Sequence, residues 1–179
     1  MDIFTAVERK NLRELKRILA AQPGAARAGD CWGRTALMLA CVEGEASFVE
    51  WLLPWSDAAA SDRDGETALM LAAFGHPRCV ELLLPVSDPL ARDADGWTAL
   101  MWAASSGSEQ CVDLLLPHSD ATAATGSGMT ALDIARKYDQ LARAQQIRRH
   151  LAAQEAASLL PAPVGTDGAH GQPLAPGQG

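Results

Sequence analysis

The segment Gly33-Arg34-Thr35-Ala36-Leu37-Met38-Leu39-Ala40 recurs as Gly65-Glu66-Thr67-Ala68-Leu69-Met70-Leu71-Ala72 and as Gly96-Trp97-Thr98-Ala99-Leu100-Met101-Trp102-Ala103. A more divergent fourth copy reads Gly128-Met129-Thr130-Ala131-Leu132-Asp133-Ile134-Ala135. A second block, Leu82-Leu83-Leu84-Pro85-Val86-Ser87-Asp88, keeps the same register and has counterparts that begin at Trp51 and Leu114. The chain is therefore an internal repeat with a period of about 32 residues, a length typical of helical solenoids.

Each repeat carries the signals of two short helices. The threonine before each first apolar segment can cap a helix, because its hydroxyl can accept a hydrogen bond from a free N–H of the first turn. First helices are expected from about Ala36, Ala68, Ala99 and Ala131. A glycine that can adopt the left-handed conformation then ends the helix in the three central repeats, and a proline stops the second helix. These residues are Gly44, Gly75 and Gly107, and Pro54, Pro85 and Pro117.

Over residues 1–153 these blocks resemble the ankyrin-repeat family, with Thr-Ala-Leu-Met where the family usually has Thr-Pro-Leu-His. The resemblance implies an all-α solenoid of helix-turn-helix units joined by hairpin-like fingers. Two departures are visible. Proline and a Ser-Asp pair replace the usual glycine turn after the second helix, and one residue is missing between Ala73 and Gly75. Neither departure affects the core positions.

The repeat predicts three full units between two caps and a tail. Residues 2–22 repeat the two-helix pattern with Asn11 where the glycine would stand, and both caps carry charged outer faces, which a solenoid needs for solubility. The C-terminal segment is rich in Pro, Gly and Ala and is expected to be disordered. The predicted boundaries are 1–29 for the N-terminal cap, 30–61, 62–92 and 93–124 for the repeats, 125–157 for the C-terminal cap, and 158–179 for the tail.

Composition excludes several classes of partner. The net charge of −7 and a pI of about 5.0 argue against nucleic acid, whose binding depends on basic side chains. No apolar run approaches the roughly 20 residues of a membrane helix, and the first residues do not form a signal sequence. We therefore expect a cytoplasmic protein that is monomeric alone, with no membrane and no nucleic acid among its partners. Its four cysteines lack paired zinc-site spacing and are expected to be free thiols.

Candidate chemical motifs are explained by the repeat, so we expect no catalytic residue, no cofactor and no metal. His118-Ser119-Asp120 looks like part of a catalytic triad, but Ser-Asp follows the same proline in the other repeats and is typical of a turn. Cys79, three residues after His76, falls at an apolar position of a second helix. The glycines recur at turns rather than in one phosphate-binding loop.

In the ankyrin arrangement the fingers and first helices line a concave face, and the residues there that packing does not require determine specificity. The resemblance assigns protein binding to Trp32, Arg34, Glu43, Glu66, Phe74, Trp97, Ser105 and Met129. Trp32, Phe74 and Trp97 are the strongest candidates, because large apolar side chains are enriched in binding hot spots. Alternatively, the two tryptophans pack across neighbouring fingers and stiffen them. Trp51 and Trp102 align with leucines and are assigned to packing.

The expected function is protein binding on the concave face. Acidic residues dominate between residues 30 and 124, whereas Lys and Arg concentrate in the caps, so a partner with a basic patch would fit unless these acids serve only as turn formers. The alternative is an inhibitory, immunity or accessory subunit that stabilises or blocks a toxin or an enzyme. A third interpretation is an effector delivered into a host cell.

Overall fold

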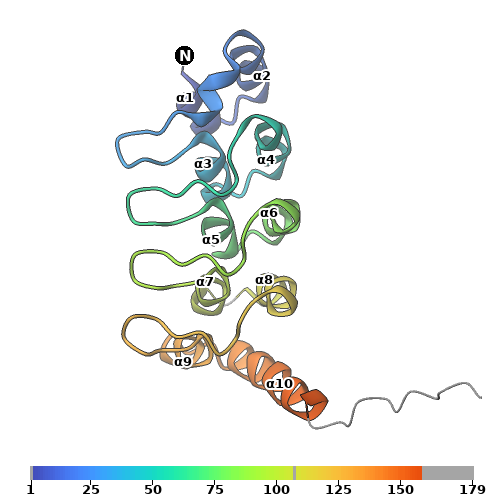
Figure 1. The fold of residues 1–179 in the computed structure, drawn as a ribbon. Coiled ribbons are helices and arrows are strands. Elements are labelled where there is room, and N and C mark those ends of the chain that lie inside the picture. Colours follow the sequence, from blue (N-terminus) through green and yellow to red (C-terminus); the bar gives the residue numbers. More distant parts are fainter. Residues whose placement is uncertain (1, 107, 159–179) are drawn as a thin grey trace, which may run out of the picture.

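The computed structural model describes residues 2–106 and 108–158, which form an elongated stack of helix pairs (Figure 1). The first helices form one column and are α1 (Ile3–Glu8), α3 (Ala36–Val42), α5 (Ala68–Ala73), α7 (Ala99–Ser106) and α9 (Ala131–Lys137). The second helices are α2 (Leu12–Ala21), α4 (Ala46–Leu52), α6 (Pro77–Leu83), α8 (Glu109–Leu115) and α10 (Leu141–Ser158). Long loops, here called the first, second, third and last fingers, project from the side of the first helices that faces away from the second helices. They comprise residues 29–35, 61–67, 92–98 and 124–130, and the first three are the central fingers. The predicted all-α solenoid is confirmed.

Three of the four predicted threonine caps are present at the start of the first helices. The hydroxyls of Thr35, Thr67 and Thr130 accept hydrogen bonds of 3.3, 3.4 and 3.3 Å from the backbone N–H three residues later. Within the described residues, the Thr98 hydroxyl before α7 has no hydrogen-bond partner, although the Thr98 carbonyl accepts from the N–H of Trp102 at 3.1 Å. A threonine hydroxyl therefore caps three of these helices, and α7 begins without one.

A left-handed residue connects the two helices of a pair. Gly44 has φ of 69° and Gly75 has φ of 136°, as predicted, whereas Gly107 lies outside the described residues. In the N-terminal cap this position belongs to Lys10, with φ of 52°, so the assignment of Asn11 to it is wrong. Asn11 instead caps α2, because its side-chain oxygen accepts from the N–H of Glu14 at 3.0 Å.

The prolines fall just after the second helices, as predicted. Each lies in a short 3-10 turn, and these turns are η2 (Leu53–Trp55), η3 (Leu84–Val86) and η4 (Leu116–His118); a further turn, η1 (Pro23–Arg27), follows α2. The aspartate of each Ser-Asp pair then forms the expected side-chain turn. For example, Asp57 Oδ1 accepts from the N–H of Ala59 at 2.9 Å, and Asp88 Oδ1 accepts from that of Leu90 at 2.8 Å.

Equivalent leucines of successive repeats form the core between the two helix columns. Leu52, Leu83 and Leu115 are fully buried on the second helices, and each such side chain contributes about 1.5–3 kcal/mol of burial free energy. Trp51 precedes the first of them and is 45% exposed, with Lys16 Nζ 4.0 Å from the centre of its ring. The prediction that Trp51 packs in the core is therefore wrong, because Trp51 does not lie on the buried face of α4.

The C-terminal helix runs one residue further than predicted. Ser158, the first residue of the predicted disordered tail, ends α10, and its hydroxyl donates to the Glu155 carbonyl at 2.7 Å. The remainder of that predicted tail, 159–179, lies outside the described residues. Ile147 is the fully buried residue that anchors α10 beneath the last repeat.

Candidate protein-binding surface

An aspartate at the base of each central finger holds the finger in a tight turn. Asp30 Oδ1 accepts hydrogen bonds of 2.9 Å from the N–H groups of both Trp32 and Arg34. The second and third fingers repeat this pair of bonds at Asp62 and Asp93. The backbone of each finger is thus fixed by one shared residue, whatever side chains follow it.

Backbone hydrogen bonds also join each finger to the next. The N–H of Arg63 donates to the Trp32 carbonyl at 3.1 Å, and the N–H of Ala94 donates to the Asp64 carbonyl at 2.8 Å. Gly65, with φ of 80°, makes this approach possible, since a Cβ there would lie 3.0 Å from the backbone nitrogen of Ala94. The fingers therefore present one continuous surface beside the first helices.

A groove of about 680 Å³ opens on this surface between the second and third fingers, α5, α7 and the end of α9. We call it the aromatic groove. Its rings are Phe74, Trp97, Trp102 and Tyr138, and its carboxylates are Asp64, Glu66, Asp93 and Asp95. Ser105 also lines it.

The rings of the aromatic groove contact one another through Trp102. The Phe74 ring meets it edge-on, with centroids 6.0 Å apart, and the Trp97 ring meets it at a tilt, with centroids 5.5 Å apart. Trp102 is half-buried, and its indole Nε1–H donates to Asp93 Oδ2 at 3.1 Å. Phe74 and Tyr138 are 55% and 47% exposed. Trp102 therefore forms the floor of the groove, and the Phe74 and Tyr138 rings beside it are exposed to solvent.

Negative charge in the groove is only partly offset by the protein. Burial raises the pKa of Glu66, and the carboxylates of Asp62, Asp93 and Asp64 raise it further, while Arg34 opposes them. Within the described residues, no ion pair includes any of the four groove carboxylates. The groove thus combines exposed aromatic rings with carboxylates that take part in no ion pair within the described residues.

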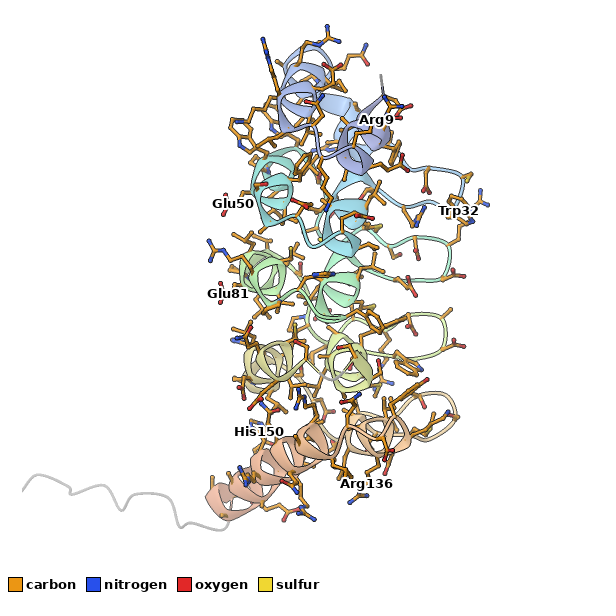
Figure 2. The ribbon with its side chains drawn as sticks, turned by 180° about the vertical axis from the view of Figure 1, so that it is seen from behind. Arg9, Trp32, Glu50, Glu81, Arg136 and His150 are labelled. Carbon is orange, nitrogen blue, oxygen red and sulfur yellow. The ribbon has the colours of Figure 1, made fainter. Side chains whose placement is uncertain are left out.

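Four of the eight residues assigned to binding from the sequence line the aromatic groove: Glu66, Phe74, Trp97 and Ser105. The other four lie outside it. Trp32 stands at the tip of the first finger (Figure 2), and the Arg34 guanidinium lies 4.7 Å from its ring centre. Glu43 is exposed at the end of α3, and Met129 is half-buried against the core in the last finger.

Sequence reasoning missed two rings of the groove. Trp102 was assigned to packing because it aligns with a leucine, and it does pack, but it also forms the groove floor. Tyr138 follows α9 in the C-terminal cap, and only the stacking of that cap on α7 brings it to Trp97 and Ser105. A tryptophan at a leucine position was the one available signal.

The motifs rejected as catalytic or metal-binding occupy structural positions. Asp120 accepts from the N–H and hydroxyl of Thr122 at 2.9 and 2.6 Å, and these bonds lower its pKa. Cys79 is fully buried, and burial raises the pKa of its thiol to about 11, so the thiol stays protonated at neutral pH. All four cysteines are free, as expected.

The described part of the chain contains neither a metal-binding cluster nor a membrane-spanning helix. No group of three or more His, Cys, Asp or Glu side chains there is arranged to hold a metal ion. None of the described helices is both long enough and apolar enough to cross a membrane.

Comparison with known families agrees with the repeat pattern and the fold. Residues 3–93 and 75–156 match a family model described as ankyrin repeats in three copies, which together cover most of the chain. No match was found among curated proteins. The sequence repeat, the stacked helix pairs and the family match lead to one assignment: this chain belongs to the ankyrin-repeat family.

Proposed function

We propose that this protein binds a partner protein through its fingers and first helices, with the aromatic groove at the centre of the contact. Ankyrin repeats are generally protein–protein interaction modules, and the family is typically non-catalytic. The observation that supports this location is the exposure of Phe74 against the Trp102 ring, on a surface where backbone hydrogen bonds join the fingers. A rigid aromatic surface loses little conformational entropy on binding, so more of its burial energy appears as affinity.

Phe74→Ala is the sharpest test of this location. The residue is 55% exposed, so its removal should leave the fold intact, whereas Trp97 is half-buried against Trp102 and its removal would also lower stability. At a hot spot, Phe74→Ala should weaken partner binding by about 2 kcal/mol or more, which is roughly 30-fold in Kd. If the partner is an enzyme or a toxin that this protein inhibits, the same variant should also weaken the inhibition of that partner's activity.

The matched control is Val86→Ala, because Val86 is also 55% exposed but lies in η3 after a second helix. A partner would be isolated by affinity purification with mass spectrometry, and its binding to each purified variant would be measured by calorimetry. Circular dichroism would confirm that both variants are folded. The proposal fails if the partner binds the Phe74 variant as tightly as the unchanged protein, or if only the Val86 variant loses affinity.

A further inference from the structure

Among the described residues, the aromatic groove is lined by carboxylates but by no positively charged side chain. Of its four carboxylates, that of Glu66 is partly buried. Burial and neighbouring carboxylates raise the pKa of Glu66, and the positive charge of Arg34 acts to lower it. Arg34 is already held by Asp30, with its Nη2 2.9 Å from Asp30 Oδ2. A cation supplied from outside would therefore relieve repulsion that the protein leaves in place.

The rings of the groove also favour a cation. The face of an aromatic ring carries negative potential, so a positively charged group over tryptophan or tyrosine is attracted to it. The rings of Phe74 and Trp97 both contact that of Trp102, and Tyr138 of the C-terminal cap also lines the groove. An organic cation with an apolar stem can thus contact rings and carboxylates together.

The first finger shows how this protein accommodates such a cation. There the guanidinium of Arg34 lies over the Trp32 ring, and its Nε donates to Asp30 Oδ2 at 3.0 Å. In the alignment of the repeats, Glu66 and Trp97 occupy the position of Arg34 in the second and third fingers. Those two fingers keep the aspartate and add an acid and a ring, but they have no arginine at this position.

We propose that the aromatic groove binds an arginine side chain of the partner, a proposal that rests on the function proposed above. The guanidinium would stack on the rings and pair with the carboxylates of Glu66 and Asp95. Arginine is favoured over lysine because its planar, weakly hydrated head group stacks on aromatic faces and bonds carboxylates through two N–H groups.

Titration with amino-acid amides tests the ligand chemistry directly. N-acetyl-arginine amide would be added to ¹⁵N-labelled protein, and the five tryptophan indole signals would be followed by NMR. The Trp97 and Trp102 signals should shift, while those of Trp51 and Trp55 should not. N-acetyl-citrulline amide, a neutral probe of similar shape, should bind at least tenfold more weakly. Equal shifts with citrulline, or equal affinity for N-acetyl-lysine amide, would overturn the assignment to arginine.

Charge-neutralising variants test which carboxylates act. Glu66→Gln and Asp95→Asn should each weaken binding of the arginine probe by about three- to tenfold, in line with charge-assisted hydrogen bonds. The control is Glu81→Gln, which removes the same charge from the outer side of α6, away from the fingers (Figure 2), and should leave binding unchanged. Equal losses in all three variants would show a general effect of net charge and would refute the groove.

The pH dependence supplies a further readout. Because the pKa of Glu66 is raised by burial and by Asp62, Asp93 and Asp64, with Arg34 opposing, this side chain becomes neutral at a higher pH than an ordinary glutamate. Binding of the probe should weaken as pH falls through that raised pKa, and Glu66→Gln should remove this part of the dependence. An unchanged pH profile in the variant would contradict the role of Glu66.

These tests separate the two proposals. If Phe74→Ala weakens partner binding while the arginine and citrulline probes bind alike, the concave-surface function stands and the arginine inference fails. If the probe binds as described but the partner is unaffected by Phe74→Ala, the protein-binding location is wrong.

Discussion

Leu83→Ala tests whether the stacked repeats behave as one folding unit. Leu83 is fully buried on α6, in the central repeat, between its equivalents Leu52 and Leu115. The change removes the Cγ and both Cδ atoms, worth about 0.8 kcal/mol each in transfer free energy, and leaves a cavity between rigid helices. We expect a loss of about 3 kcal/mol in the free energy of unfolding, measured by urea denaturation.

The same experiment reports cooperativity, because the tryptophans lie on both sides of the altered repeat. Residues 62–92 contain no tryptophan, whereas Trp32, Trp51 and Trp55 precede them and Trp97 and Trp102 follow. Each repeat is stabilised mainly by its neighbours, so the indole NMR signals of both groups should disappear at one urea concentration. Leu90→Ala, at a 54% exposed position of the same repeat, is the control and should cost less than about 0.5 kcal/mol. A loss below about 1 kcal/mol for Leu83→Ala, or two separate midpoints, would refute the reasoning.

Two further substitutions test the fold at single positions. Trp51→Ala should cost about 1–2 kcal/mol in urea denaturation, less than a buried tryptophan would, since it removes a ring that is 45% exposed and its contact with Lys16; a loss above about 3 kcal/mol would mean that the ring is buried after all. Gly44→Ala should destabilise by about 1–2 kcal/mol and lower the melting temperature, because Gly44 has φ of 69° and a Cβ would collide with the His76 imidazole. Gly24→Ala, where a Cβ meets nothing within 4 Å, is its control, and equal melting temperatures for the two variants would contradict the strain argument.

Local signals in the sequence were sufficient to place the helices. The first helices begin at Ala36, Ala68, Ala99 and Ala131, as the preceding threonines predicted. Each such signal acts within a few residues of itself: a hydroxyl reaches an N–H three residues on, and a proline restricts the residue before it. A repeat displays each signal several times, so chance matches are easily recognised. The starting residues of these first helices therefore followed from the sequence alone.

Side-chain direction was harder to predict, and Trp51 shows why. The blocks Leu82-Leu83-Leu84 and Leu114-Leu115-Leu116 are uniformly apolar, so they contain no polar residue to mark the solvent side of the helix. In the structure the middle residue of each block is fully buried, and the residue before it is only partly buried. Alignment of Trp51 with a leucine therefore indicated an apolar position but not a core one.

The aromatic groove was predicted only in part, for a different reason. Glu66, Phe74 and Trp97 were predicted because each occupies a concave-face position that packing of the repeat does not require. The contribution of Tyr138 depends on how the C-terminal cap stacks on α7, which is a contact between residues more than thirty positions apart. An alignment of repeats compares equivalent positions, and it does not report which non-equivalent positions meet.

Differences between the fingers, rather than features that all repeats share, bring the aromatic rings and the carboxylates of the groove together. The frame of each central finger comes from shared parts: an aspartate that accepts two N–H groups, a glycine with positive φ, and a backbone bond to the next finger. The side chain at the position of Arg34 is left free by that frame. In the first finger this residue is Arg34, which forms an ion pair with Asp30 and lies over the Trp32 ring. In the second and third fingers the equivalent residues are Glu66 and Trp97. The groove therefore forms where the fingers carry acidic side chains that no ion pair within the described residues offsets, and the proposed arginine of a partner would supply the opposite charge.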